Sequence, residues 1–134
     1  MEQKTDCIFC KIIAGEIPAE KVYEDDKILA FLDINPVTLG HTLIIPKEHY
    51  QMMVDTPDEL LCYCFAKSKE LMIKIKEAVG ADFVTVSVVG LDVPHFHIHL
   101  VPRKFSDNLA NFWPTTKYLD GEMQKVAEKI KKTL

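Results

Sequence analysis

The chain has 134 residues, of which 48% are hydrophobic and 27% charged, enough for one domain, residues 1–134, with a hydrophobic core. Its net charge of −4 argues against a partner that is a nucleic-acid polymer, because such binders usually carry a basic surface. No apolar run approaches the roughly 20 residues that span a bilayer. Residues 1–10 lack a basic region followed by an apolar one, so we expect no secretory signal. We therefore expect no membrane partner and a cytoplasmic location.

The first third of the chain predicts a short helix followed by three strands. Asp6 is expected to cap the helix at its N-terminus, and Gly15 and Pro18 to end it. Apolar runs rich in β-branched and aromatic residues then alternate with turn-forming residues, which is typical of strands. The three predicted strands span residues 21–24, 28–34 and 41–46.

The rest of the chain predicts a long helix, two strands and a second helix. Apolar residues recur at three- and four-residue steps from Leu60 to Val79, and Gly80 follows, which predicts an amphipathic helix over residues 57–79. Strands on both sides of one long helix favour an α+β fold with a mainly antiparallel sheet. The later elements are strands 82–90 and 95–102, an irregular segment 104–118 and a terminal helix 119–134 with a basic end.

Three of the five histidines, His95, His97 and His99, alternate with apolar residues. On a strand they share one face, while the apolar residues face the core. Three interpretations remain open from the residues alone. The strand could have a polar face that happens to be histidine, the histidines could form a catalytic metal site open to water, or an imidazole could act as nucleophile and proton carrier on a phosphoryl group.

Four cysteines occur in two closely spaced pairs. In a reducing cytoplasm, thiols or metal ligands are more plausible than disulfides. Cys7 and Cys10 lie one helical turn apart and could pack, form a redox pair or bind a metal. Cys62 and Cys64 lie on different sides of the predicted long helix, so we expect one to be buried, the other peripheral and neither functional.

The run HFHIHLV, residues 95–101, follows the pattern His-φ-His-φ-His-φ-φ, in which φ is a hydrophobic residue. It resembles the motif of the histidine-triad (HIT) superfamily. Residues 7–36 and 40–50 are similar to the N-terminal half of the branch that contains nucleoside phosphoramidases and bacterial nucleotide-binding homologues. The resemblance covers about residues 6–103 and implies a HIT-like α+β fold. It also implies a homodimer formed through the long helix and a continuous sheet.

The resemblance implies a reaction at a nucleotide. His97 matches the nucleophile that attacks the α-phosphate of a purine nucleoside monophosphate derivative and forms a nucleotidyl-histidine, which water then hydrolyses. His99 and His41 match positions that contact the phosphate, where donors could neutralise phosphoryl charge. The leaving group could be an amine, a second nucleotide or a sugar. The alternative function is a nucleotide-binding regulatory module with weak or no catalysis.

The N-terminal half would supply the nucleoside pocket by the same resemblance. Asp33 matches the carboxylate that binds the ribose hydroxyls, although an aspartate after a strand is more often a turn former. Four apolar positions match residues around the base, and core packing explains each of them nearly as well. They are Ile8, Phe9, Ile12 and Phe31.

The resemblance further implies a structural zinc site. Two thiolates and two imidazoles form a tetrahedral ligand set of the kind that zinc prefers. Such a site would pin the N-terminal helix to the sheet and leave the second and third triad histidines for chemistry. The four ligands would be Cys7, Cys10, His49 and His95.

The segment before the triad departs from the family pattern. Many members carry a Gly-rich loop with neutral donors to the phosphate, whereas here VVGLDVPH is shorter and places Asp92 three residues before His95. A carboxylate there could repel the phosphate. It could instead accept a hydrogen bond from a triad histidine and help it to protonate the leaving group, and this is the role we expect for Asp92.

Overall fold

The computed structural model describes residues 6–109 and 114–134. Its elements, in chain order, are α1 (Ile8–Ile13), β1 (Lys21–Glu24), β2 (Ile28–Leu32), β3 (Thr42–Pro46), the 3₁₀ helix η1 (Met53–Asp55), α2 (Asp58–Val79), β4 (Phe83–Ser87), β5 (Ile98–Arg103) and α3 (Glu122–Thr133). The five strands form one sheet in the order β1-β2-β3-β5-β4, and every neighbouring pair is antiparallel. This confirms the predicted α+β fold with an antiparallel sheet.

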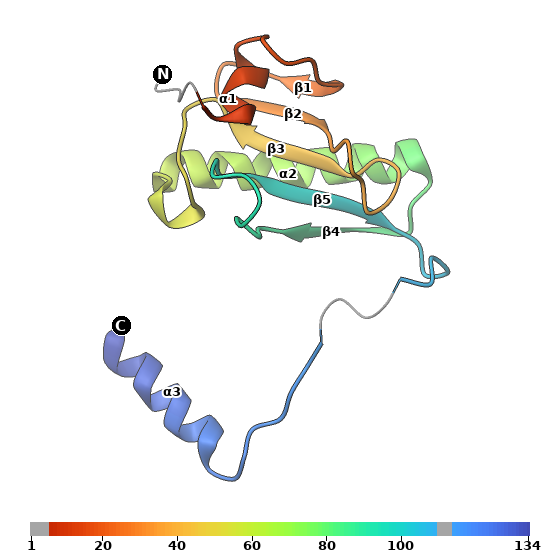
Figure 1. The fold of residues 1–134 in the computed structure, drawn as a ribbon. Coiled ribbons are helices and arrows are strands. Elements are labelled where there is room, and N and C mark those ends of the chain that lie inside the picture. The colour runs from red at the N-terminus through yellow and green to blue at the C-terminus, as the bar shows by residue number, and fades with distance from the viewer. Residues whose placement is uncertain (1–5, 110–113) are drawn as a thin grey trace.

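The sheet has a helix on each face, with α2 running along one face and the short α1 lying over the other (Figure 1). The alternation of side chains along the strands produces two hydrophobic clusters. In β2, Ile28 and Ala30 pack in the cluster that contains α2 residues, whereas Leu29 and Phe31 pack in the cluster that contains α1 residues. The middle of the sheet is therefore buried on both faces.

The triad segment follows the same alternation. The apolar residues between and after the histidines belong to the α2 cluster and are almost fully buried, as predicted. The strand itself begins at Ile98 and not at residue 95, because the amide of Phe96 donates to the carbonyl of Tyr50 at 2.6 Å and not to a neighbouring strand. Of the three triad histidines, only His99 therefore lies within β5.

Other predicted ends move by a few residues. Asp6 does not cap α1; the cap is Cys7, whose Sγ accepts the amide of Cys10 at 3.4 Å. The second predicted strand ends at Leu32, because a carboxylate oxygen of Asp33 accepts the amide of Asn35 at 2.8 Å and turns the chain. The fourth predicted strand, residues 82–90, shortens to β4.

The long helix is confirmed as α2. It ends at Gly80, whose φ of +67° is the left-handed conformation that glycine adopts without strain. Cys64 is fully buried and Cys62 is exposed, as their spacing predicts. None of the described helices is both long enough and apolar enough to cross a membrane.

The turn between β1 and β2 is tied to α2 by one carboxylate. Asp25 accepts the hydroxyls of Tyr23 and Tyr63 and the amides of Lys27 and Ile28. Burial raises the pKa of the Asp25 carboxyl, but these hydrogen bonds outweigh it and lower the pKa to about 2. The carboxylate therefore stays ionised and fixes one end of the helix against the sheet.

The terminal helix is confirmed as α3, with Lys131 and Lys132 in its last turn. Figure 1 shows it standing apart from the sheet, and none of its residues is buried. Met123, Val126 and Ile130 share one side of α3 at three- and four-residue steps. The described parts of the segment predicted to be irregular, residues 104–109 and 114–118, contain no helix or strand, and the rest of it lies outside the described residues.

Candidate active site and metal site

Four side chains from three separate segments of the chain converge where α1 meets the sheet. Each is 9% exposed or less, and their ligand atoms all lie within 4.8 Å of one another. Neighbouring ligands of a tetrahedral zinc ion lie roughly 3.3–3.8 Å apart. The measured separations are 3.4 Å from Cys7 Sγ to His95 Nδ1, 3.3 Å from Cys10 Sγ to His49 Nδ1 and 3.1 Å between the two Nδ1 atoms. The structure thus brings together all four predicted ligands.

His95 is oriented as a metal ligand. Its Nε2–H donates to the carbonyl of Pro46 at 2.8 Å, which leaves the lone pair on Nδ1, the atom that faces the cysteines. Burial lowers the pKa of His95 to about 4, so the imidazole is neutral at pH 7, as a ligand must be. The residues present therefore fit zinc in number, type and orientation.

His97 is oriented differently. Its Nδ1–H donates to the carbonyl of His95 at 2.7 Å, so the lone pair of the neutral ring lies on Nε2. The side chain is 1% exposed, yet Nε2 has no hydrogen-bond partner among the described residues. The ring of Phe9, from α1, packs edge-on against it with 5.2 Å between centroids. A fixed imidazole with a buried, unused lone pair has the features of a nucleophile.

His99 and His41 form a pair beside His97. His41 Nε2 lies 2.9 Å from His99 Nδ1, and His99 Nε2 is the other buried side-chain atom without a partner in the described part of the chain. The rings of His97 and His99 are 4.9 Å apart. Burial lowers the pKa of His41, and burial together with the two neighbouring histidines lowers that of His99. Both rings are therefore neutral at pH 7.

Asp33 lies at the edge of this group. Its Oδ2 is 3.7 Å from His41 Nε2, while Oδ1 accepts the amide of Asn35. The turn-forming role is thus observed. The same carboxylate lies next to His41, and its contact with a ribose stays a prediction.

Of the four apolar positions predicted around the base, three are buried in the α1 cluster: Phe9, Ile12 and Phe31 are 4–7% exposed. Ile8, on the outer side of α1, is 47% exposed. Core packing therefore accounts for the three buried residues. Contact of all four with a base stays a prediction.

Asp92 lies beside the second triad histidine. Its Oδ1 is 3.4 Å from His97 Nε2 without forming a hydrogen bond, and its side chain is 68% exposed. Burial raises the pKa of the Asp92 carboxyl, but hydrogen bonds from the backbone amides of Asp92 and Val93 and the electrostatic effect of the neighbouring histidines outweigh it, so the pKa lies below its ordinary value. The Asp92 carboxylate is therefore an anion next to the candidate nucleophile, and most of its side chain is exposed to solvent.

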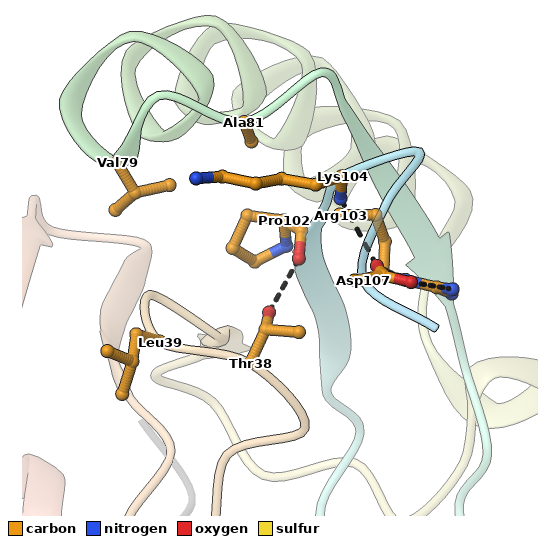
Figure 2. A pocket seen from close by; sticks show the side chains of 8 residues that line it. All are labelled: Thr38, Leu39, Val79, Ala81, Pro102, Arg103, Lys104 and Asp107. Atoms are coloured by element: carbon orange, nitrogen blue, oxygen red, sulfur yellow. Dashed lines mark hydrogen bonds and ion pairs between the residues drawn. The ribbon is translucent and has the colours of Figure 1, made fainter. Parts of the chain in front are cut away.

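A cavity of about 370 Å³ lies beside the loop that joins β2 and β3, next to the ends of α2 and β5. Figure 2 shows the Thr38 hydroxyl donating to the carbonyl of Pro102 across one side of it, and Arg103 paired with Asp107 on the other. None of the predicted site residues lines this cavity. Thr38 and Leu39 of the β2–β3 loop form part of its wall, and this loop leads into His41.

The family model described as HIT domain matches residues 14–106, which include the triad but not the cysteine pair. The chain belongs to the HIT family. It is 42% identical to an uncharacterised HIT-like protein of Methanocaldococcus jannaschii, over 93% of this chain and 98% of that protein. It is 42% identical to an Arabidopsis thaliana protein named adenylylsulfatase, over 79% of this chain and 56% of that protein. A Candida albicans relative named adenosine 5′-monophosphoramidase is 35% identical, over 100% of this chain and 95% of its own.

Solved HIT structures share the fold. A Streptococcus mutans protein superposes with a TM-score of 0.88 at 37% identity, over 98% of this chain and 87% of that one. A Mycobacterium smegmatis protein described as a Zn-bound histidine triad family protein superposes with a TM-score of 0.76 at 31% identity, over 96% of this chain and 98% of that one. The arrangement of the sheet and helices is thus that of the HIT fold.

Proposed function

We propose that this HIT protein is a nucleotide hydrolase or transferase that acts at the α-phosphate of purine nucleoside monophosphate derivatives. The observation that carries the proposal is the pair of buried, unpartnered Nε2 atoms on the adjacent rings of His97 and His99, stated for the described residues. The relatives named adenosine 5′-monophosphoramidase and adenylylsulfatase support an adenylyl compound as substrate.

The chemistry takes two steps. His97 Nε2 uses its lone pair to form a bond to the α-phosphorus, and the phosphorylated ring, which keeps its Nδ1–H, becomes a cation. The bond to the leaving group breaks, and that group departs with the bonding electrons and the proton of His99 Nε2. This leaves His99 as its conjugate base, with Nδ1 held by the N–H of His41 and its charge balanced by that of His97. In the second step, water attacks the phosphorus, its proton passes to His99, and the bond to His97 breaks. The products are the protonated leaving group and the nucleoside monophosphate.

Asp33 and α1 would position the nucleoside. Asp33 would accept the ribose hydroxyls, and its 3.7 Å approach to His41 would bring the attached α-phosphate toward the histidines. The exposed Ile8 offers an apolar surface for the base, and Phe9 lies buried beside it in α1. Phe9 also contacts His97, so the pocket and the nucleophile share one wall.

The metal centre and the assembly complete the proposal. We propose a structural zinc ion held by Cys7, which caps α1, by Cys10 within α1, and by His49 and His95, and the Zn-bound relative supports it. A homodimer is supported by the exposed apolar side of α3 and by β4 at the edge of the sheet, and light scattering of the full chain tests it. The cytoplasmic location stays a prediction, with which the four free cysteines are consistent.

Turnover of a fluorogenic adenosine phosphoramidate tests the activity. His97→Ala should reduce turnover to less than about a thousandth of wild type, because the attacking atom is lost, while AMP still binds. Cys62→Ser, at an exposed cysteine, is the matched control and should keep full activity. A panel of substrates followed by phosphorus NMR would identify the leaving group. AMP binding without turnover of any substrate in the panel would instead favour the regulatory module.

A further inference from the structure

The loop between β2 and β3 presents one backbone amide to the active site. The N–H of Val37 points at His41 Nδ1, with 3.1 Å between the nitrogens. A backbone amide can only donate, so His41 Nδ1 must accept. A neutral imidazole has one lone pair and one N–H, and burial keeps His41 neutral. The proton of His41 is therefore on Nε2.

The next hydrogen bond follows from the first. His41 Nε2–H faces His99 Nδ1 at 2.9 Å, so His99 Nδ1 accepts and the proton of His99 is on Nε2. His97 has the opposite arrangement, because its Nδ1–H donates to a carbonyl. The two unpartnered atoms of the site are then unlike: a lone pair on His97 and an N–H on His99.

We propose that the amide of Val37, acting through His41, sets this protonation pattern and so makes His99 the proton donor to the leaving group. Its catalytic use depends on the proposed function, but the pattern itself does not. Val37 and His41 are in this view positioning residues, since they act through His99. Any residue except proline supplies the amide, so no side-chain motif marks this role.

The loop that carries the amide is held from several sides. The Thr38 hydroxyl donates to the Pro102 carbonyl of β5 (Figure 2), and the Thr38 carbonyl accepts the amide of His41 at 3.1 Å. Gly40 has a φ of +99°, and a Cβ there would lie 3.0 Å from a methyl group of Val79. The position of the Val37 amide is therefore a fixed property of the fold.

The same argument separates the two histidine clusters. Asp33, His41 and His99 are close enough together to suggest a second metal site. A metal bound to His41 Nε2 would force the proton of His41 onto Nδ1. Two N–H donors, that of His41 Nδ1 and that of Val37, would then face each other without an acceptor. His95 differs, because its remote nitrogen faces the Pro46 carbonyl, an acceptor, and leaves Nδ1 for a metal. The cluster of Asp33, His41 and His99 is thus arranged to hold protons and not a metal.

The tautomers can be read directly in the full-length, zinc-containing wild-type protein. Long-range proton–nitrogen correlation spectra of the nitrogen-15 labelled imidazoles at pH 7.5 should show His41 and His99 protonated at Nε2 and His97 at Nδ1. A spectrum with His99 protonated at Nδ1 would overturn the proposal. This measurement requires no turnover, so it stands even where the proposed function fails.

A pair of variants tests the catalytic consequence. Val37→Pro removes the amide hydrogen, and Val37→Ala keeps it. With an amine leaving group, Val37→Pro should lower kcat at least about tenfold with little change in KM, whereas Val37→Ala stays within about twofold of wild type. With a nitrophenyl ester of AMP, whose leaving group needs no proton, the defect of Val37→Pro should largely disappear. Equal kcat values for the two variants, or an equal loss on both substrates, would contradict the role; should Val37→Pro not fold, the wild-type tautomers decide.

Discussion

Each triad histidine differs from the others in the group that its second nitrogen contacts. His95 donates to the carbonyl of Pro46 and offers Nδ1 to the cysteines, and His97 donates to a carbonyl and keeps a lone pair on Nε2. His99 accepts from His41 and keeps an N–H. The triad motif and its resemblance to the HIT family predict which histidines lie in the candidate site. They do not predict the tautomers, because carbonyls and amides are present at nearly every residue and leave no mark in the sequence.

Asp92 is the residue whose contacts differ most from the expected role. It stands 3.4 Å from the candidate nucleophile without a hydrogen bond and is largely exposed. Asp92→Asn should tighten the binding of AMP a few-fold, because two charges about 4 Å apart interact by roughly 1 kcal/mol in water. Titration calorimetry measures it, with Asp82→Asn as a control on an exposed aspartate. An unchanged affinity with a slower reaction would support the role expected from the sequence, in which the carboxylate helps a histidine to protonate the leaving group.

Among the helices and strands, the periodicity of apolar residues predicts those whose sequence has a strong local pattern. The helix α2 and strands β1 to β3 appear within two residues of their expected bounds, since three- to four-residue and two-residue repeats reflect local geometry. The start of β5 was wrong by three residues. It depends on a hydrogen bond between Phe96 and Tyr50, which lie far apart in the chain. Hydrogen bonds between residues far apart in the chain leave no pattern in the local sequence. This one lies beside the candidate active site.

The carboxylate that ties the β1–β2 turn to α2 makes stability depend on pH. Folding lowers the pKa of Asp25 from 3.8 to about 2, so its contribution is complete above pH 4 and is lost as the pH falls through 2. Asp25→Asn should be less stable than wild type at pH 6, and the difference should shrink as the pH falls from 4 to 2. Urea unfolding across this range measures it, with Asp26→Asn as the exposed neighbouring control. A difference that stays constant with pH would show that Asp25 acts by packing alone.

At the scale of the whole molecule, the cysteine–histidine cluster connects segments that the chain separates widely. Cys10 and His95 are 85 residues apart, and the cluster joins α1, the segment after β3 and the segment before β5. The sequence could name the four ligands only through the resemblance, because their spacing of 3, 39 and 46 residues follows no local repeat. A bound metal would therefore stabilise the fold by linking these segments at one point.

Zinc should accordingly be present at one per chain in protein purified without chelators, and cobalt substitution should show thiolate charge-transfer absorption. A ligand present at 100 to 1,000 times its Kd stabilises the folded state by about 3–4 kcal/mol, which for a chain of this length corresponds to a rise in Tm of roughly 10 °C. Cys7→Ser should lose the metal and most of this increment, whereas Cys62→Ser, at an exposed cysteine, should change neither. Because α1 also supplies Phe9, which packs on His97, Cys7→Ser should slow turnover too. If the purified protein contains no zinc, or if its Tm does not change after chelation, the four residues form ordinary core packing. In that case only the apolar residues of α1 hold it against the sheet.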